Sequence, residues 1–245
     1  YQQMLYVDKK NQLWIYKAST GLSRIDLNTF AIVSYTGFAQ DSKASFYYAA
    51  YEDENGSLFL PHPQGIACYQ REVDTFNIIP VENVGAGVRL ITGTKNDELL
   101  FTTRREVYRY DIHQHAINKL PELTIDNGAI AELEVDAEGY LWVSNWFNDN
   151  RGLVCYDLKT GRIRTSYSRR SDSINYIAST DIWQILCEND GVYFASNSGG
   201  LWFYNYQSET MHKLERKIGY QENSTDQFRS IHRDHFGRLW LGGSL

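Results

Sequence analysis

The sequence has 245 residues and a formal net charge of −6 at pH 7, and no stretch of it approaches the roughly 20 apolar residues of a membrane span. The acidic balance argues against a nucleic-acid-binding surface, which needs a basic stripe, and no signal peptide is visible at Tyr1, so we expect any targeting segment to lie outside this chain. Aromatic residues make up 14% of the chain, including 18 tyrosines, whereas there are only 4 prolines. Because aromatic residues favour strands over helices, the composition predicts an all-β fold.

The first repeated unit begins at Asp8. Residues 8–15 predict a tight turn of the form Asp-x-x-Asn, followed by a strand that contains Trp14. Residues 21–26 predict the next strand, and an Asp-x-x-Thr turn leads from Asp26 into a short outer strand over residues 30–35. In the later units an apolar segment also precedes the acidic turn residue, so each unit predicts four antiparallel strands.

The unit recurs along the rest of the chain. Its turn and second strand are clearest at residues 136–143 and 234–241, decayed at 53–60, and weakest at 96–101 and 188–194. The anchor positions of the six copies lie 41 to 51 residues apart and are Trp14, Phe59, Leu100, Trp142, Tyr193 and Trp240. A period of about 45 residues is that of a four-stranded propeller blade. The sequence therefore predicts one partial β-propeller over residues 1–245, with about five and a half blades.

The best copy of the unit resembles a known family. Residues 136–143 read Asp-x-x-Gly-x-Leu-Trp-Val, and residues 152–157 read Gly-Leu-x-x-Tyr-Asp. This pair of motifs is similar to the two-component regulator propeller repeat, and the similarity extends over essentially the whole chain. It is weakest at residues 94–114, where neither turn glycine is kept. The resemblance implies the extracytoplasmic sensor region of a Bacteroides-type hybrid two-component system.

In that family the propellers precede an immunoglobulin-like segment, one membrane span, a histidine kinase and a response regulator, and none of these parts is in this chain. The resemblance therefore implies a periplasmic domain of an inner-membrane protein whose full-length form is a histidine kinase. It implies an oligosaccharide ligand, and as partners the adjacent propeller and immunoglobulin-like segment of the same protein. The resemblance implies no catalytic residue, because the family's propeller binds a ligand and relays a signal.

Candidate chemistry outside the repeat is sparse. Cys68 and Cys155 occupy equivalent positions two units apart and are not expected to form a disulfide; with Cys187 they are predicted to be buried thiols, or alternatively one forms an intermolecular disulfide. His113 and His115 lack a third ligand at a suitable spacing, so we expect no metal site. No motif for a nucleotide or another cofactor is present, and the repeated aspartates have a structural explanation as turn formers.

Alignment of the repeats indicates a better site. The first strand of each unit lines the central channel of a propeller, and the position five residues before the acidic turn residue varies strongly. Aromatic rings cover the apolar faces of sugars, and arginines hydrogen-bond their hydroxyl or carboxylate groups. From this position and the one after it we take six candidate ligand-binding residues: Tyr47, Tyr48, Arg89, Glu132, Trp183 and Arg229. The alternative is that they pack between blades or lie on a solvated rim.

A further candidate is Trp146, in a segment that extends one turn of the fourth unit. The distance from anchor to glycine is longer here than in the first unit, and residues 145–151 read Asn-Trp-Phe-Asn-Asp-Asn-Arg. Exposed aromatic residues in such a turn mark a contact surface. The alternative is that Trp146 folds back onto its blade.

These observations favour a non-enzymatic segment of a sensor kinase that relays oligosaccharide occupancy across the membrane. Two alternatives remain: a polysaccharide lyase or hydrolase with carboxylates and arginines in the channel, and a protein-interaction scaffold without a small ligand. Because the sixth unit is cut short, we expect an incomplete ring, closure by another chain, or self-association into a homodimer through open blade edges.

Overall fold

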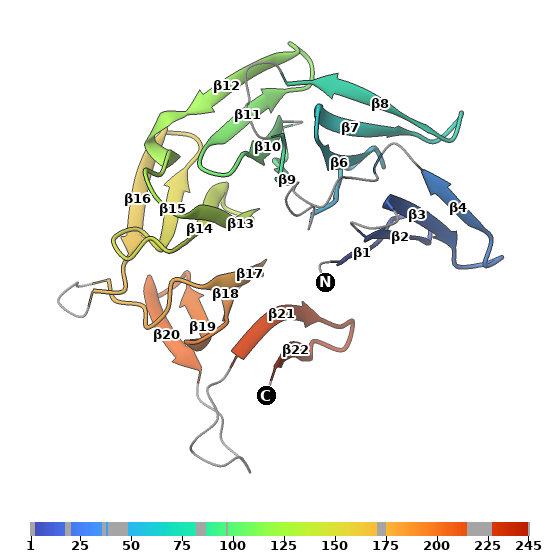
Figure 1. Cartoon of the computed structure of the whole chain (residues 1–245). Helices are drawn as coiled ribbons and strands as arrows, with labels where there is room; N and C mark the ends of the chain where they lie inside the picture. The colour runs from blue at the N-terminus through green and yellow to red at the C-terminus, as the bar shows by residue number, and fades with distance from the viewer. Residues whose placement is uncertain are drawn as a thin grey trace. The chain divides into compact units, whose positions relative to one another are not determined.

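A computed structural model describes residues 3–17, 21–35, 38, 49–81, 87–96, 98–170, 175–214 and 227–244 (Figure 1). These residues form two compact units, one from Tyr1 to Leu123 and one from Thr124 to Leu245. Apart from a 3-10 turn at Pro121–Leu123, the elements defined in them are β-strands. Among the residues that the structure describes, there is no helix long and apolar enough to cross a membrane.

In the described residues the first unit contains three four-stranded antiparallel sheets, each in chain order from its inner to its outer strand. Their strands are β1 (Gln3–Val7), β2 (Gln12–Lys17), β3 (Gly21–Asp26) and β4 (Ile32–Tyr35); β5 (Tyr51–Glu52), β6 (Leu58–His62), β7 (Gly65–Gln70) and β8 (Thr75–Pro80); and β9 (Leu90–Gly93), β10 (Glu98–Thr102), β11 (Val107–Asp111) and β12 (Ala116–Leu120).

In the described residues the second unit has two further four-stranded sheets and one two-stranded sheet. Their strands are β13 (Ala129–Val135), β14 (Tyr140–Trp146), β15 (Leu153–Asp157) and β16 (Arg162–Tyr167); β17 (Ile182–Cys187), β18 (Gly191–Ser196), β19 (Gly200–Asn205) and β20 (Thr210–Leu214); and β21 (Gln227–Arg233) and β22 (Leu239–Ser244). The four-strand meander per repeat confirms the predicted all-β propeller fold, and the two-stranded sheet is the predicted half blade.

The repeated aspartate holds its turn through side-chain hydrogen bonds. In the fourth sheet, Asp136 Oδ1 accepts hydrogen bonds from the backbone N–H groups of Glu138 (3.0 Å) and Tyr140 (2.9 Å), and Oδ2 accepts one from Trp142 Nε1 at 2.9 Å. Gly139 has a φ of 86°, which favours glycine at this turn position. Asp8 and Asp234 bond Trp14 and Trp240 in the same way, at 2.9 and 2.8 Å. The motif is therefore a turn that also fixes the tryptophan anchor of the next strand.

The apolar cores lie between neighbouring sheets of the same unit. In the second unit, Trp142 of β14 packs against Phe194 and Tyr204 of the next sheet, with ring centroids 5.2 and 5.0 Å apart. In the first unit, Trp14 of β2 packs in the same way against Tyr69 of β7, at 4.7 Å. Sheets thus stack face to face, as neighbouring blades do, and the anchors Trp14 and Trp142 have no exposed surface.

The turn before each outer strand contains a residue with positive φ. This position carries Gly161 in the fourth sheet (φ 70°) and Phe30 in the first (φ 59°). The first outer strand consequently begins at Ile32, not at Phe30 as the sequence suggested, because Phe30 closes the turn. A bulky residue in the left-handed region costs about 1–2 kcal/mol.

We expect Phe30→Gly to raise the free energy of unfolding by about 1 kcal/mol, because Phe30 is 73% exposed and loses little packing. Urea denaturation measures the effect. The matched control is Gly161→Ala, whose Cβ would have ordinary contact only, with Tyr156 Oη at 3.6 Å, so backbone strain alone should lower stability. A loss of stability in Phe30→Gly would contradict this account.

Candidate functional site

The candidate position identified from the repeats is a β-bulge in all three sheets of the second unit. The pairing register of β13, β17 and β21 shifts between Ile130 and Glu132, between Ile182 and Gln184, and between Phe228 and Ser230. The extra residues are therefore Ala131, Trp183 and Arg229. A bulge residue falls outside the regular alternation of the strand, so its side chain is re-aimed and is free to vary between repeats.

One of these bulge residues, Trp183, contacts both Trp146 and Arg229. The rings of Trp146 and Trp183 have centroids 4.6 Å apart at an interplanar angle of 47°, and the Cζ atom of Arg229 lies 5.0 Å from the centroid of the Trp183 ring. The three side chains come from β14, β17 and β21, one from each sheet of the unit. We call Trp146, Trp183 and Arg229 the aromatic–arginine platform.

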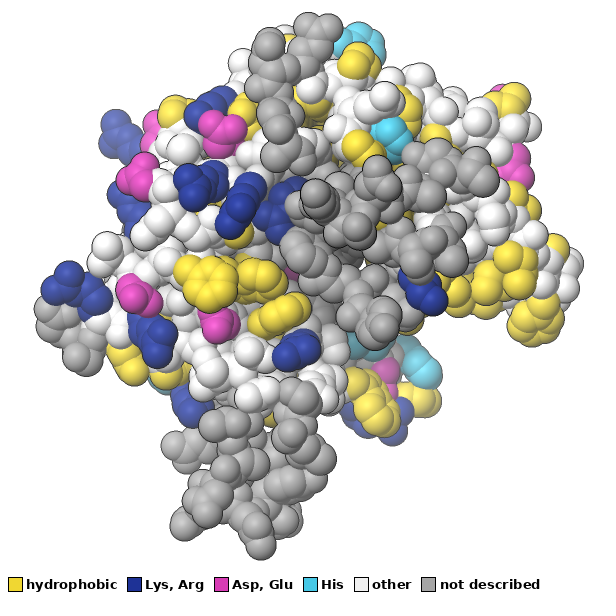
Figure 2. Space-filling model, in the orientation of Figure 1, with side chains coloured by type: hydrophobic (Ala, Val, Ile, Leu, Met, Phe, Trp, Pro, Cys, Tyr) yellow, Lys and Arg dark blue, Asp and Glu magenta, His cyan; other side chains and the backbone are white. Residues whose placement is uncertain are grey.

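Hydrogen bonds orient the platform. Trp146 Nε1 donates to the carbonyl oxygen of Ile182 at 3.0 Å, and Arg229 Nε donates to Asn197 Oδ1 at 3.2 Å. Both tryptophans are half-buried, whereas Arg229 is exposed. Figure 2 shows hydrophobic side chains gathered over the region of β14 and β17, with basic side chains beside them. Flat rings next to a fixed guanidinium can cover the apolar face of a ligand and hydrogen-bond its polar edge.

Glu132 follows the bulge residue of β13. Burial, together with the charge of nearby Glu134, raises the pKa of Glu132 to about 8, and Glu132 Oε1 accepts a hydrogen bond from the backbone N–H of Leu133 at 3.0 Å. At neutral pH this carboxyl group is therefore mainly protonated. It can donate a hydrogen bond, which an ordinary surface glutamate cannot do at this pH.

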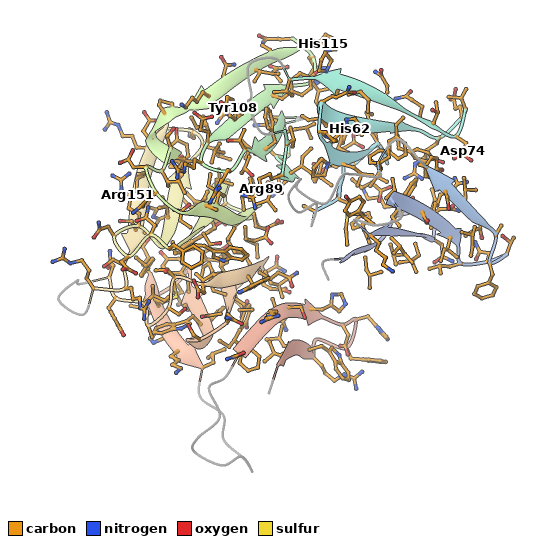
Figure 3. All side chains as sticks on the ribbon, viewed as in Figure 1. His62, Asp74, Arg89, Tyr108, His115 and Arg151 are labelled. Carbon is orange, nitrogen blue, oxygen red and sulfur yellow. The ribbon has the colours of Figure 1, made fainter. Side chains whose placement is uncertain are left out.

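The remaining predicted residues are Arg89, Tyr47 and Tyr48. Arg89 belongs to the first unit, where it directly precedes β9 and is 7% exposed (Figure 3). Its backbone N–H donates to the carbonyl oxygen of Thr102 at 2.8 Å. Tyr47 and Tyr48 lie outside the described residues.

The sequence placed Trp146 within an extended turn, and the structure corrects this placement. Trp146 is the last residue of β14 and folds onto the neighbouring sheet, while Phe147 is the exposed aromatic residue of the turn, at 75%. Asn197 was missed by the repeat alignment. It lies in the turn after β18, which corresponds to the turn after Trp146, and this correspondence is the signal that could have identified it.

The three cysteines are free thiols in the structure. Cys68, Cys155 and Cys187 are all free, as expected for buried thiols, and burial raises the pKa of Cys155 to about 12. The three are buried or half-buried. Across the described ranges, no three His, Cys, Asp or Glu side chains gather into a group that could hold a metal ion.

No family model matches the sequence, and no curated protein matches it at a significant level. Among solved structures, the virginiamycin B lyase of Staphylococcus aureus is similar with a TM-score of 0.72 and 15% identity, over 98% of this chain and 77% of that one. A protein described as the extracellular domain of a hybrid two-component system of B. thetaiotaomicron is similar with a TM-score of 0.55 and 16% identity, over 99% of this chain. Another B. thetaiotaomicron extracellular domain, described as part of a one-component system, gives 0.61 and 15% over 98% of this chain.

These likenesses show the propeller-type fold. This chain spans 38% of the length of each of the two extracellular domains, so it corresponds to well under half of such a region. Sensor domains and lyases are both among the structural neighbours. The fold is therefore compatible with a sensor role and does not by itself separate sensing from catalysis.

Proposed function

We propose that this chain is a ligand-sensing part of the periplasmic region of a hybrid two-component sensor kinase, and that the aromatic–arginine platform binds an oligosaccharide. The observation that carries the proposal is the convergence of Trp146, Trp183 and Arg229 from three successive sheets. The extracellular sensor domains among the structural neighbours support the same role.

The chemistry of the platform suits a sugar. A pyranose presents an apolar face to a tryptophan ring and a rim of hydroxyl groups to an arginine or a protonated carboxyl. An acidic sugar would add a bidentate pair with Arg229. The platform joins three sheets, so a bound ligand would favour one arrangement of those sheets over another. Occupancy can bias a kinase only if the ligand binds the two arrangements with different affinities.

The proposal is tested by calorimetric titration with a panel of neutral trisaccharides (maltotriose, xylotriose, mannotriose) and acidic ones (trigalacturonic acid). We expect Trp183→Ala to weaken the binding of the active sugar by about tenfold, through the loss of ring stacking. The matched control is Phe236→Ala: Phe236 is 70% exposed in the turn at the far end of β21, so affinity should not change. Absence of binding to any sugar, or equal affinities of the two variants, would contradict the proposal.

A second candidate is a polysaccharide lyase or hydrolase, which the protonated Glu132 favours because a neutral carboxyl is the form a general acid requires. Incubation with polysaccharides and an assay of new reducing ends or unsaturated products separates the two functions. Turnover that is abolished in Glu132→Gln would replace the sensor proposal. A protein-interaction scaffold would instead show neither sugar binding nor turnover.

A further inference from the structure

A polar cavity lies at the end of the fourth sheet where β13 begins and β14 ends. It has a volume of about 390 Å³ and lies between residues 124–127 and residues 148–151. The side chains that line it are mostly polar: Thr124, Asp126, Asn127, Asn148, Asn150 and Arg151. Figure 3 labels Arg151 beside this sheet.

The strand pairing fixes the two walls of the cavity. Ala129 at the start of β13 pairs with Trp146 at the end of β14, so the preceding and following segments leave the sheet at the same end. Gly128, at a φ of 82°, approaches so closely that a Cβ would lie 2.0 Å from the carbonyl oxygen of Trp146. The second wall is held by hydrogen bonds from Arg151 N–H to Asn148 Oδ1 (3.1 Å) and from Asn145 Nδ2 to the Arg151 carbonyl (2.7 Å).

One buried polar atom of the cavity lining has no hydrogen-bond partner among the described residues, and a second such atom belongs to a residue that is hydrogen-bonded to the lining. One is Thr124 Oγ1, on a residue that lines the cavity, and the other is Asn145 Oδ1, whose residue is 2% exposed. The amide nitrogen of Asn145 donates to the carbonyl oxygen of Arg151, a residue of the lining. An unpaired buried polar atom costs about 1–3 kcal/mol, so a polar ligand that pairs with Thr124 Oγ1 gains a full hydrogen bond.

The charged side chains that line the cavity indicate which class of ligand it can bind. Within the described residues neither the carboxylate of Asp126 nor the guanidinium of Arg151 has an ion-pair partner, and both line the cavity. The remaining lining groups are three carboxamides, one hydroxyl and Ile125, with no aromatic ring on which a sugar could stack. One negative, one positive and several neutral polar groups complement a small molecule that carries both charges.

We propose that this cavity binds a free α-amino acid, with its ammonium group at Asp126 and its carboxylate at Arg151. The carboxamides of Asn127, Asn148 and Asn150 and the hydroxyl of Thr124 supply the remaining hydrogen bonds. The volume suits a molecule of this size. The site is separate from the aromatic–arginine platform, although its second wall begins directly after Trp146, so occupancy would also restrain the turn that follows that residue.

The test is calorimetric titration of the whole chain with glycine, L-serine, L-asparagine, L-glutamate and L-lysine, against glucose, glycerol, sodium acetate and ammonium chloride. We expect at least one amino acid to bind, and the uncharged and singly charged compounds not to bind. Asp126→Asn and Arg151→Gln should each lower its affinity by about tenfold or more, because each removes a charged partner at nearly constant volume. Both residues are exposed, so thermal unfolding without ligand should be unchanged.

Matched controls are Glu138→Gln and Arg162→Gln, exposed residues of the same sheet outside the cavity lining, which should keep wild-type affinity. Trp183→Ala should also keep it, so failure of the sugar proposal and failure of this one are distinguishable. The proposal is overturned if no amino acid binds, if acetate or glucose binds equally well, or if Asp126→Asn and Arg151→Gln leave affinity unchanged.

Discussion

Asp136→Ala is expected to lower the free energy of unfolding by about 4 kcal/mol. Asp136 is 3% exposed and accepts hydrogen bonds from two backbone N–H groups and from the indole of the fully buried Trp142. The substitution leaves these donors without an acceptor, and each buried unpaired group costs about 1–3 kcal/mol. Urea denaturation followed by tryptophan fluorescence measures the loss.

The chain contains a matched control in Asp234. Asp234 makes the same three bonds, to the N–H groups of Phe236 and Arg238 and to Trp240 Nε1, but Trp240 is 57% exposed. Water can replace the lost acceptor there, so Asp234→Ala should cost clearly less than Asp136→Ala. Equal losses would show that the turn, and not the buried indole contact, determines the effect of this motif.

The same control has a defined pH dependence. The bond from Trp240, followed by those from Arg238, lowers the pKa of Asp234 to about 2. Because the folded-state pKa lies below the unfolded value, the contribution of Asp234 is complete above the unfolded pKa and is lost as the pH falls from about 4 towards 2. The stability difference between wild type and Asp234→Ala should therefore shrink over that interval.

Glu132→Gln is expected to raise the free energy of unfolding at pH 8 by about 3 kcal/mol and to leave it nearly unchanged at pH 4. Burial raises the pKa of Glu132 to about 8, whereas the unfolded chain has the ordinary value near 4.5. Between these values the unfolded chain releases a proton that the folded protein retains, so wild-type stability falls as the pH rises. Glutamine does not titrate, so the stability of the variant should not fall with rising pH in this way.

Denaturation curves at intervals from pH 4 to pH 9 measure the effect, with Glu138→Gln as the control. Glu138 is an exposed residue of the turn after β13, and its replacement should leave the pH profile of the wild type in place. Parallel pH profiles for Glu132→Gln and the wild type would contradict the assignment of a protonated carboxyl at this position. They would also remove the observation that favours a general acid here.

Much of the candidate site could be found from the repeats, and the reason is structural. Trp183 and Arg229 occupy the same position of the repeat. The residue type at this position varies from one repeat to the next, whereas the position directly before it is apolar in the second to sixth repeats. The structure shows that this position is the bulge. The protonated state of Glu132 could not be found in this way, because it arises mainly from burial, which an alignment of repeats does not reveal. The cavity at Asp126 and Arg151 was also missed, because its two walls are loops whose approach depends on strand pairing.

The sequence by itself determined the local structure, namely which residues form the turns and that a four-stranded sheet repeats along the chain, because turn geometry depends on residues within a few positions of one another. Only the tertiary structure decided the burial of side chains and the contacts between neighbouring sheets of the same unit. Trp142 and Trp240 stand in the same motif, yet the first is completely buried against the next sheet and the second is 57% exposed. In the same way Trp146, Trp183 and Arg229 meet across 37 to 46 positions of sequence, since neighbouring sheets pack face to face and bring equivalent strand ends together.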